Sequence, residues 1–138
     1  MLLTKDLYER IAAAKMFIDE HYASGIDLAA ISGHACLSRF HFHRIFRQVY
    51  RHTPHQYLTR KRMDRAKELL AENMQVSDVS NELGYESATT FSLLFKKEIG
   101  FAPTYFRNIA WLRKQEAKSE PRKFIPHCFL ESKQHTLG

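Results

Sequence analysis

Cysteine, which stabilises small disulfide-rich and zinc-binding proteins, is scarce in this chain, with only 2 cysteines among 138 residues. Cys36 and Cys128 are too few for a disulfide framework or a four-cysteine zinc site, and the 8 histidines show no spacing typical of metal ligands. The 5 glycines and 4 prolines are also too few for a fibrous or disordered chain. The sequence therefore predicts a folded protein in a reducing compartment, with no metal or other cofactor.

Long apolar runs are missing as well. No stretch approaches the roughly 18 consecutive apolar residues of a membrane span, and the first residues, MLLTKDLYERI, lack the apolar core of a signal peptide. We therefore expect a cytoplasmic protein that does not enter a membrane. At 138 residues, 44% of them hydrophobic and 26% charged, the chain suits one domain or two small lobes.

Acidic residues are scarce in one region, residues 38–67, which we call the basic segment. It carries 9 lysines and arginines against Asp64 alone, a charge of +8, whereas the whole chain carries +6 and the remainder therefore −2. Such asymmetry indicates an anionic partner held by one region. Nucleic acid is the commonest such partner for a basic protein, and a membrane surface is the alternative.

The hydrophobic pattern is helical throughout, and no segment shows strand alternation, so the predicted fold class is all-α. Asp27, Ser38 and Ser87 are placed to cap helix N-termini, and Thr53–Gln56 has the pattern of a capping box. The expected helices span about 7–22, 28–35, 38–50, 54–72, 77–83, 87–99 and 103–111. Beyond Arg113 we expect a loosely held tail, whose apolar residues pack back onto the protein: Phe124, Ile125, Phe129 and Leu130.

The chain contains an internal repeat. Leu28 and Ile31 match Val76 and Val79 at an offset of 48 residues. At an offset of 49, the segment with Ser38, Phe42, Ile45, Phe46 and Pro54 matches Ser87, Phe91, Leu94, Phe95 and Pro103. Each unit is thus a short helix, a tight turn and a second helix, which is typical of a helix-turn-helix module; an αα-hairpin that only builds a core is the alternative.

The two faces of the helix at 38–50 differ in a way that favours DNA recognition. At about 100° per residue, Phe42, Ile45 and Phe46 form one stripe. The opposite stripe, about 160° away, contains Phe40, His43, Arg44 and Arg47. Arginine pairs in bidentate fashion with guanine, and an aromatic ring packs on a thymine methyl, so this stripe suits base recognition in the major groove.

The corresponding stripe of the second unit is much less basic, with Thr89, Ser92, Leu93 and Lys96. We therefore expect the first unit to carry most of the sequence discrimination and the second to contribute phosphate contacts and shape recognition. The linking helix of about 19 residues is about 28 Å long, close to the roughly 34 Å between successive major-groove faces. A monomer is thus predicted to occupy two consecutive grooves at an asymmetric site.

These residues resemble the DNA-binding domain of the AraC/XylS family of bacterial transcription regulators over about residues 7–107. The strongest matches are Ser38–Arg47, Leu83–Ser87 and the segment with Phe95, Lys96, Lys97, Gly100, Pro103, Phe106 and Arg107. The resemblance implies seven helices, with one helix-turn-helix subdomain at 7–52, a linker helix at 53–73, a second subdomain at 74–112 and a tail at 113–138. It also implies promoter binding that activates transcription through contact with RNA polymerase.

The family pattern implies base contacts with double-stranded DNA in both units. In the first unit they fall on Arg39, Phe40, His43 and Arg44, with Arg47 nearer the backbone, and in the second on Ala88, Thr89, Ser92 and Leu93. The predicted DNA-binding residues also include the capping residues Ser38 and Ser87, and Lys96 of the second outward stripe. Arg62 matches a structural ion-pair position. Most members carry a separate small-molecule sensor domain, for which this chain has no room. We therefore expect it either to be similar to the short stand-alone members or to be a fragment of a longer protein.

Two residues depart from the family pattern. Arg51 stands where the family usually has the glycine that ends the helix, so we expect that turn to be built differently. Leu93 stands where many members have a polar or basic residue, which weakens the expected specificity of that helix. Cys36, in the first turn, is expected to be a small packed residue.

Two other classes of function remain as alternatives. A non-specific nucleic-acid or RNA-binding module would share the basic charge without preferring any sequence. DNA-repair methyltransferases carry a similar helical module, but they need a zinc-bound reactive-cysteine domain that Cys36 and Cys128 cannot supply. The sequence therefore predicts a binding protein and not an enzyme.

Overall fold

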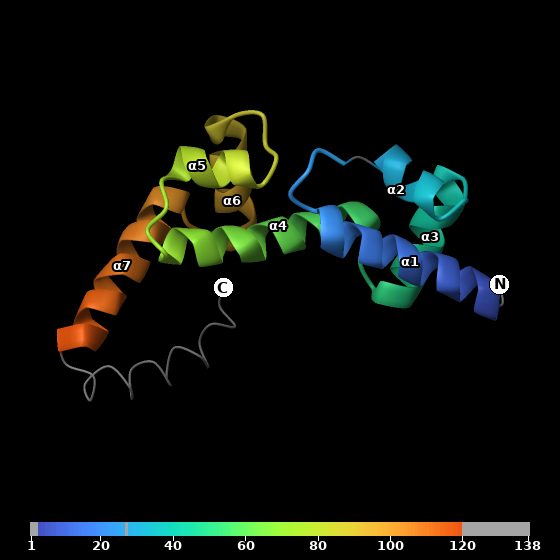
Figure 1. Cartoon of the computed structure of the whole chain (residues 1–138), viewed down its shortest axis with the longest axis horizontal. Helices are drawn as coiled ribbons and strands as arrows, with labels where there is room; N and C mark the ends of the chain where they lie inside the picture. Colours follow the sequence, from blue (N-terminus) through green and yellow to red (C-terminus); the bar gives the residue numbers. More distant parts are fainter. Residues whose placement is uncertain (1–2, 27, 120–138) are drawn as a thin grey trace. The chain divides into compact units, whose positions relative to one another are not determined.

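The computed structural model describes residues 3–26 and 28–119, which form seven helices and no strand (Figure 1). This confirms the all-α class. The helices are α1 (Lys5–His21), α2 (Leu28–His34), α3 (Arg39–Tyr50), α4 (Pro54–Ala71), α5 (Val76–Glu82), α6 (Ala88–Ile99) and α7 (Pro103–Ser119). The chain divides into two compact units, residues 1–64 and 65–138, and the division falls within α4.

Most helix starts lie where the capping residues predict them. Thr53 Oγ1 accepts the amide of Gln56 at 3.1 Å, and the Gln56 side chain accepts the amide of Thr53 at 2.9 Å, which completes the predicted capping box of α4. Thr4 caps α1 through the amide of Leu7. The predicted cap Asp27 and the predicted packing of Phe124, Ile125, Phe129 and Leu130 lie outside the described residues.

The prediction for α7 was wrong. This helix continues to Ser119 instead of ending near Trp111, so the expected loose tail does not begin at Arg113. Residues 112–119 are mostly good helix formers and include neither glycine nor proline, so nothing in their chemistry ends the helix. Their polar composition and weak hydrophobic periodicity do not exclude a helix.

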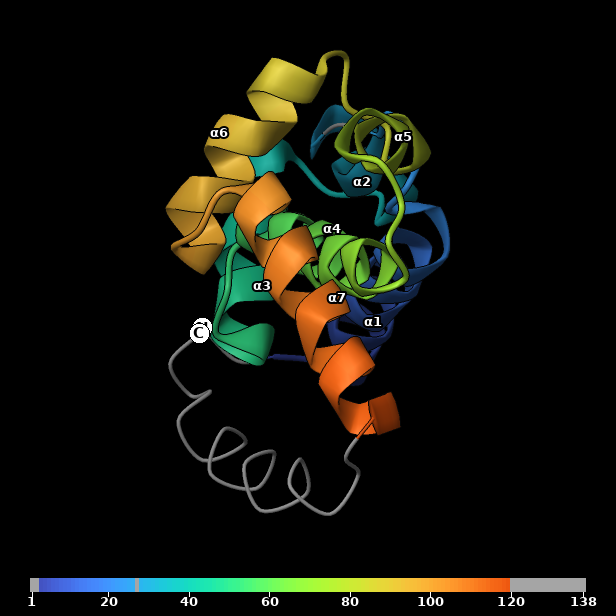
Figure 2. The same cartoon turned by 90° about the vertical axis from the view of Figure 1, so that its left-hand side faces the viewer.

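The core of the first unit is formed where α2 and α3 pack against α1 and the first turns of α4 (Figure 1). Its fully buried residues are Ile11, Ala14, Ile18, Ile31, Ala35, Phe42, Ile45, Phe46 and Leu58. In the second unit α5 packs on α6 and α6 on α7 (Figure 2). Buried residues there include Leu69, Leu70, Val79, Leu83, Phe91 and Phe95.

The internal repeat is present in the side-chain packing. In each unit three aromatic rings follow one another, with centroids 5.6 and 5.8 Å apart in the first unit and 5.7 and 5.7 Å apart in the second. These rings are Phe42, Phe46 and Tyr57 in the first unit and Phe91, Phe95 and Phe106 in the second. The helix that follows α3 therefore packs a ring on α3 in the same way as the helix that follows α6 packs a ring on α6.

The tight turn of each unit is also repeated, with one left-handed residue, Cys36 (φ 57°) or Gly84 (φ 82°). In both turns the amide of the next residue donates to a serine carbonyl, Ser32 in the first unit at 3.2 Å and Ser80 in the second at 3.1 Å. Cys36 is exposed, so its predicted packing was wrong. Its side chain projects from the turn because the turn conformation fixes the direction of the Cα–Cβ bond.

The ends of α3 and α6 are built alike. Arg51 (φ 67°) and Gly100 (φ 99°) are both left-handed, and their amides donate to Arg47 O at 2.8 Å and Lys96 O at 2.9 Å. The expectation of a different turn at Arg51 was therefore wrong. The left-handed conformation costs a residue with a Cβ roughly 1 to 2 kcal/mol that glycine does not pay.

Arginine side chains tie later helices to earlier helix ends. Arg62 donates from Nε to Tyr22 O at 2.7 Å and from Nη2 to Ser24 O at 2.8 Å, which joins α4 to the end of α1. Arg107 donates to Asn73 O at 3.3 Å, which joins α7 to the end of α4. Tyr22 lies at the C-terminal end of α1, where carbonyl groups lack intrahelical partners, and Arg62 supplies a donor there.

A polar cluster on α1 and α4 completes the first unit. Asp19 accepts hydrogen bonds from the Tyr57 hydroxyl at 2.5 Å and from Lys15 Nζ at 3.1 Å, and Lys61 Nζ lies 3.5 Å from it. Burial raises the pKa of Asp19, but the hydrogen bonds from Tyr57 and Lys15 outweigh it, so the pKa lies below its ordinary value. The ionised carboxylate thus stabilises the fold.

We predict that Asp19→Asn lowers the free energy of unfolding by about 1 to 2 kcal/mol near neutral pH, because charge-assisted hydrogen bonds are lost. Since folding lowers the pKa of Asp19, its contribution is complete above the unfolded pKa of about 3.9 and is lost as pH falls through the folded pKa. Urea unfolding at neutral pH and at about pH 3 measures this. A difference between the two proteins that does not shrink in acid contradicts the account.

Candidate nucleic-acid interface

The outward face of α3 presents the residues predicted for base contact. Phe42 and Phe46 are fully buried on the inner face, so the opposite side of the helix meets solvent. Phe40 is 91% exposed, which is extreme for an aromatic ring. Arg39, Arg44 and Arg47 are exposed and His43 is half-buried.

The first turn of each recognition helix is fixed by a serine. Ser38 Oγ accepts the amide of His41 at 3.2 Å, and Ser87 Oγ accepts the amide of Thr90 at 3.1 Å. Ser87 also donates to Thr90 Oγ1 at 2.9 Å. Because the cap sets the residue at which a helix begins, it also sets which side chains of the first turns face outward. Ser38 and Ser87 are themselves exposed.

The arginines of α3 differ in their electrostatic surroundings from several cations of α1 and α4. Salt bridges within the described residues engage Arg10 with Asp6, Lys61 with Asp19 and, on α4, Arg65 with Glu68. Across that same part of the chain no salt bridge involves a residue of α3. The positive charge of α3 is therefore not neutralised by internal carboxylates, and it is offered to an external anion.

Part of the basic segment has an internal role. Arg62 donates to the carbonyls of Tyr22 and Ser24, so it is a structural residue of the first unit. These contacts are hydrogen bonds to the backbone, whereas the family position predicted an ion pair. Lys61 and Arg65 pair with carboxylates. The cations that face solvent without such partners thus concentrate on α3, and the charge count alone did not distinguish these two groups.

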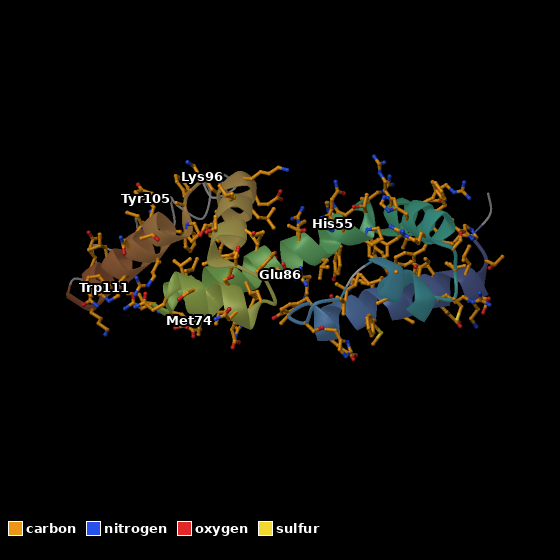
Figure 3. The ribbon with its side chains drawn as sticks, turned by 90° about the horizontal axis from the view of Figure 1, so that it is seen from above. His55, Met74, Glu86, Lys96, Tyr105 and Trp111 are labelled. Carbon is orange, nitrogen blue, oxygen red and sulfur yellow. The ribbon has the colours of Figure 1, made fainter. Side chains whose placement is uncertain are left out.

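The outward face of α6 is less polar. Thr89 and Lys96 are exposed and Leu93 is 68% exposed, whereas Ala88 and Ser92 are half-buried. Lys96 lies on α6 at the edge of the second unit (Figure 3). Leucine with that exposure suits an apolar contact, for example with a thymine methyl group, and offers no hydrogen bond.

The structure adds residues that the sequence analysis missed. A cleft of about 410 Å³ on the first unit is lined by Arg44, Arg47, Gln48 and Arg51, of which Gln48 and Arg51 were not predicted as site residues. The available signal for Gln48 was its spacing of four residues from Arg44, which places both on one face of the helix. Arg51 lies beyond the end of α3, where helical spacing gives no such signal. Within the described ranges no group of three metal-binding side chains occurs, and no helix is long and apolar enough to cross a membrane.

These features define a helix-turn-helix protein, and comparison with known proteins specifies its family. Residues 31–109 match the family model described as a helix-turn-helix domain. The chain belongs to the AraC/XylS family of transcription regulators, a class that acts by binding and is generally not enzymatic.

Individual relatives agree with this assignment. The probable transcriptional regulator LumQ of Photobacterium leiognathi is 36% identical over 92 residues, which cover 66% of this chain and 37% of LumQ. The arabinose operon regulatory protein of Escherichia coli is 32% identical over 100 residues, which cover 71% of this chain and 34% of that protein. The chain thus spans about a third of the length of these relatives.

A solved structure relates the fold to DNA. The DNA-binding domain of AdpA, a global transcriptional factor crystallised with a target DNA, is 25% identical and superposes with a TM-score of 0.64. The match covers 86% of this chain and 98% of that domain. The C-terminal domain of AraT from Geobacillus stearothermophilus, at 23% identity and a TM-score of 0.68, shares the fold over 79% of this chain and 88% of that one.

We predict that Phe40→Ala weakens binding of a preferred duplex about fivefold, equivalent to about 1 kcal/mol, because part of the ring is buried on binding. The melting temperature stays unchanged because the ring makes little contact within the protein. Fluorescence anisotropy and thermal unfolding measure the two effects. The matched control Phe42→Ala, on the buried face, lowers stability by about 3 to 5 kcal/mol. A fall in stability for Phe40→Ala contradicts this geometry.

Proposed function

We propose that the chain is a sequence-specific regulator of transcription that inserts α3 and α6 into the major groove of promoter DNA. The observation that carries the proposal is the outward face of α3, where exposed arginines without internal salt bridges share the helix face with an almost fully exposed phenylalanine. On a helix face that meets only solvent, an exposed aromatic ring makes no favourable contact. In the major groove, base edges can accept hydrogen bonds from the arginines, and a thymine methyl group can pack against the ring.

Within α3 the roles divide by position. Arg39, Phe40, His43 and Arg44 lie on the first turns and contact base edges, with Arg44 as the guanine-pairing group. Arg47, one turn further, contacts the phosphate backbone. Ser38 fixes the start of the helix and thereby the register of these contacts.

Helix α6 contributes less specificity. Its contact residues are Ser87, Ala88, Thr89, Ser92, Leu93 and Lys96. Only Lys96 among them is charged, and it contacts a phosphate, while Thr89, Ser92 and Leu93 make weaker base and sugar contacts. The first helix-turn-helix unit therefore provides most of the discrimination between sequences.

The length of α4 supports occupation of two successive grooves by one chain. Its 18 residues span about 27 Å, comparable with the roughly 34 Å that separates groove faces by one turn of DNA. A monomer then binds an asymmetric site of about two turns in the bacterial cytoplasm. Activation of transcription is supported by relatives named as activators, including AarP of Providencia stuartii, which is 28% identical over 98 residues. Contact with RNA polymerase is the route of activation that we propose.

We predict that Arg44→Ala and Lys96→Ala have different effects on DNA binding. Arg44→Ala costs about 1 to 3 kcal/mol on a selected duplex and relaxes preference at one base pair, because a bidentate contact is lost. Lys96→Ala weakens selected and random duplexes alike, because a phosphate contact carries no sequence information. Competition titrations with both duplexes measure the specificity ratio of each variant.

The alternative is a non-specific nucleic-acid-binding module. In that case both variants lower the affinity for all duplexes by the same factor, and the wild-type protein shows no specificity ratio to lose. Equal effects of Arg44→Ala on selected and random DNA would therefore favour the alternative and contradict the assigned role of α3.

A further inference from the structure

The cleft at the C-terminal end of α3 concentrates positive charge in one concave place. Three guanidinium groups, those of Arg44, Arg47 and Arg51, line its volume of about 410 Å³ together with the Gln48 amide. No carboxylate lines the cleft. In the described part of the chain, none of these arginines takes part in a salt bridge. Such a cleft has the charge and donors for a tetrahedral anion.

Arg51 holds a conformation that its side chain disfavours. At φ 67° it forms the left-handed end of α3, and the equivalent residue of the second unit, at the end of α6, is Gly100 at φ 99°. Glycine therefore builds the same turn without steric strain. Arginine at this position adds strain to the fold and a guanidinium group to the cleft, and strained residues concentrate at functional positions.

Arg51 lies just beyond the outward face of α3. Arg44 and Arg47 follow Phe40 by four and seven residues, so they share its face of the helix. Arg51 follows the last helical residue in a left-handed conformation, and it joins these two arginines as part of the lining of the cleft. A helix C-terminus carries roughly half a negative charge, which repels an anion. Three guanidinium groups outweigh this charge, and an anion at this end of α3 is held by the side chains alone.

We propose that this cleft binds one phosphate group of the DNA backbone, with Arg51 as the closing side chain beside Arg47 and Gln48. The inference rests on the proposed function and deepens it, because it adds Gln48 and Arg51 as contact residues. It assigns them a role in affinity for DNA and none in discrimination between bases. Phosphate contacts fix the position of a recognition helix on the duplex without specifying bases. Arg44 also lines the cleft and is the lining residue nearest to Phe40 in the sequence. Its guanidinium group pairs with a base and not with this phosphate.

The decisive variant is Arg51→Gly, because it removes the guanidinium group and relieves the backbone strain at once. We expect affinity for selected and random duplexes to fall by a similar factor of about tenfold. The slope of log K against log salt concentration becomes shallower by about 0.9, the value for one phosphate. The melting temperature is unchanged or higher, because glycine suits the left-handed position.

Two control variants test charge and geometry separately. Arg10→Ala removes one exposed charge from α1, where Arg10 pairs with Asp6 at 3.1 Å, and it leaves the salt slope unchanged. Arg51→Lys keeps the charge but not the planar fork, so it retains the slope and loses only part of the affinity. An equal change of slope for Arg10→Ala and Arg51→Gly would overturn the proposal, since it would show a general effect of net charge.

The remaining outcomes separate this proposal from other readings. A lower melting temperature for Arg51→Gly with an unchanged salt slope overturns it in favour of a role in helix stability. Submillimolar binding of inorganic phosphate alone that requires Arg51, with DNA affinity unaffected, assigns the cleft to a free phosphorylated ligand and also overturns it. If the wild-type protein binds all sequences equally, the proposed sequence-specific function fails. The change in the slope of log K against log salt concentration for Arg51→Gly still decides whether the cleft holds a DNA phosphate.

Discussion

Burial of one face of α3 is the constraint on which the rest of the structure depends. Phe42 and Phe46 are fully buried against the first unit, and the Tyr57 ring of α4 packs on Phe46 at 5.8 Å. Helical geometry then forces Phe40 and Arg44 to the opposite side, where nothing within the unit covers them. The Asp19 cluster and Arg62 fasten α1 to α4 around this arrangement, so they position the recognition face without touching it.

The two units show how one scaffold is given two different surfaces. Their turns, the left-handed ends of α3 and α6, and their chains of aromatic rings agree within a few tenths of an ångström or a few tens of degrees. What differs is the outward stripe, which holds arginines in α3 and mainly small or apolar residues in α6. The end of the helix differs too, since Arg51 stands where the second unit has Gly100. Packing thus repeats while the binding chemistry does not, as expected when function resides in exposed side chains on a common fold.

Local signals in the sequence predicted the parts of the fold that local chemistry determines. The caps at Ser38, Thr53 and Ser87, and the buried stripe of α3, follow from residue spacing alone and are confirmed. The failures have physical reasons as well. The extent of α7 was underestimated because its last residues are polar yet good helix formers. The turn at Arg51 and the exposure of Cys36 depend on left-handed conformations, which occur at non-glycine residues only where the surrounding structure imposes them. In the cleft at the end of α3, Arg51 was missed for the same reason, whereas Gln48 was indicated by its spacing of four residues from Arg44.

The central claim, that α3 provides most of the sequence discrimination, is tested most directly by selecting bound duplexes from a random pool of about 30 base pairs, roughly three helical turns. The account predicts one asymmetric consensus whose informative base pairs are concentrated in one half, the half contacted by α3. Two equally informative halves would show that Thr89, Ser92 and Leu93 discriminate as strongly as Arg44 does. Either that result or a pool without any enrichment would contradict the account.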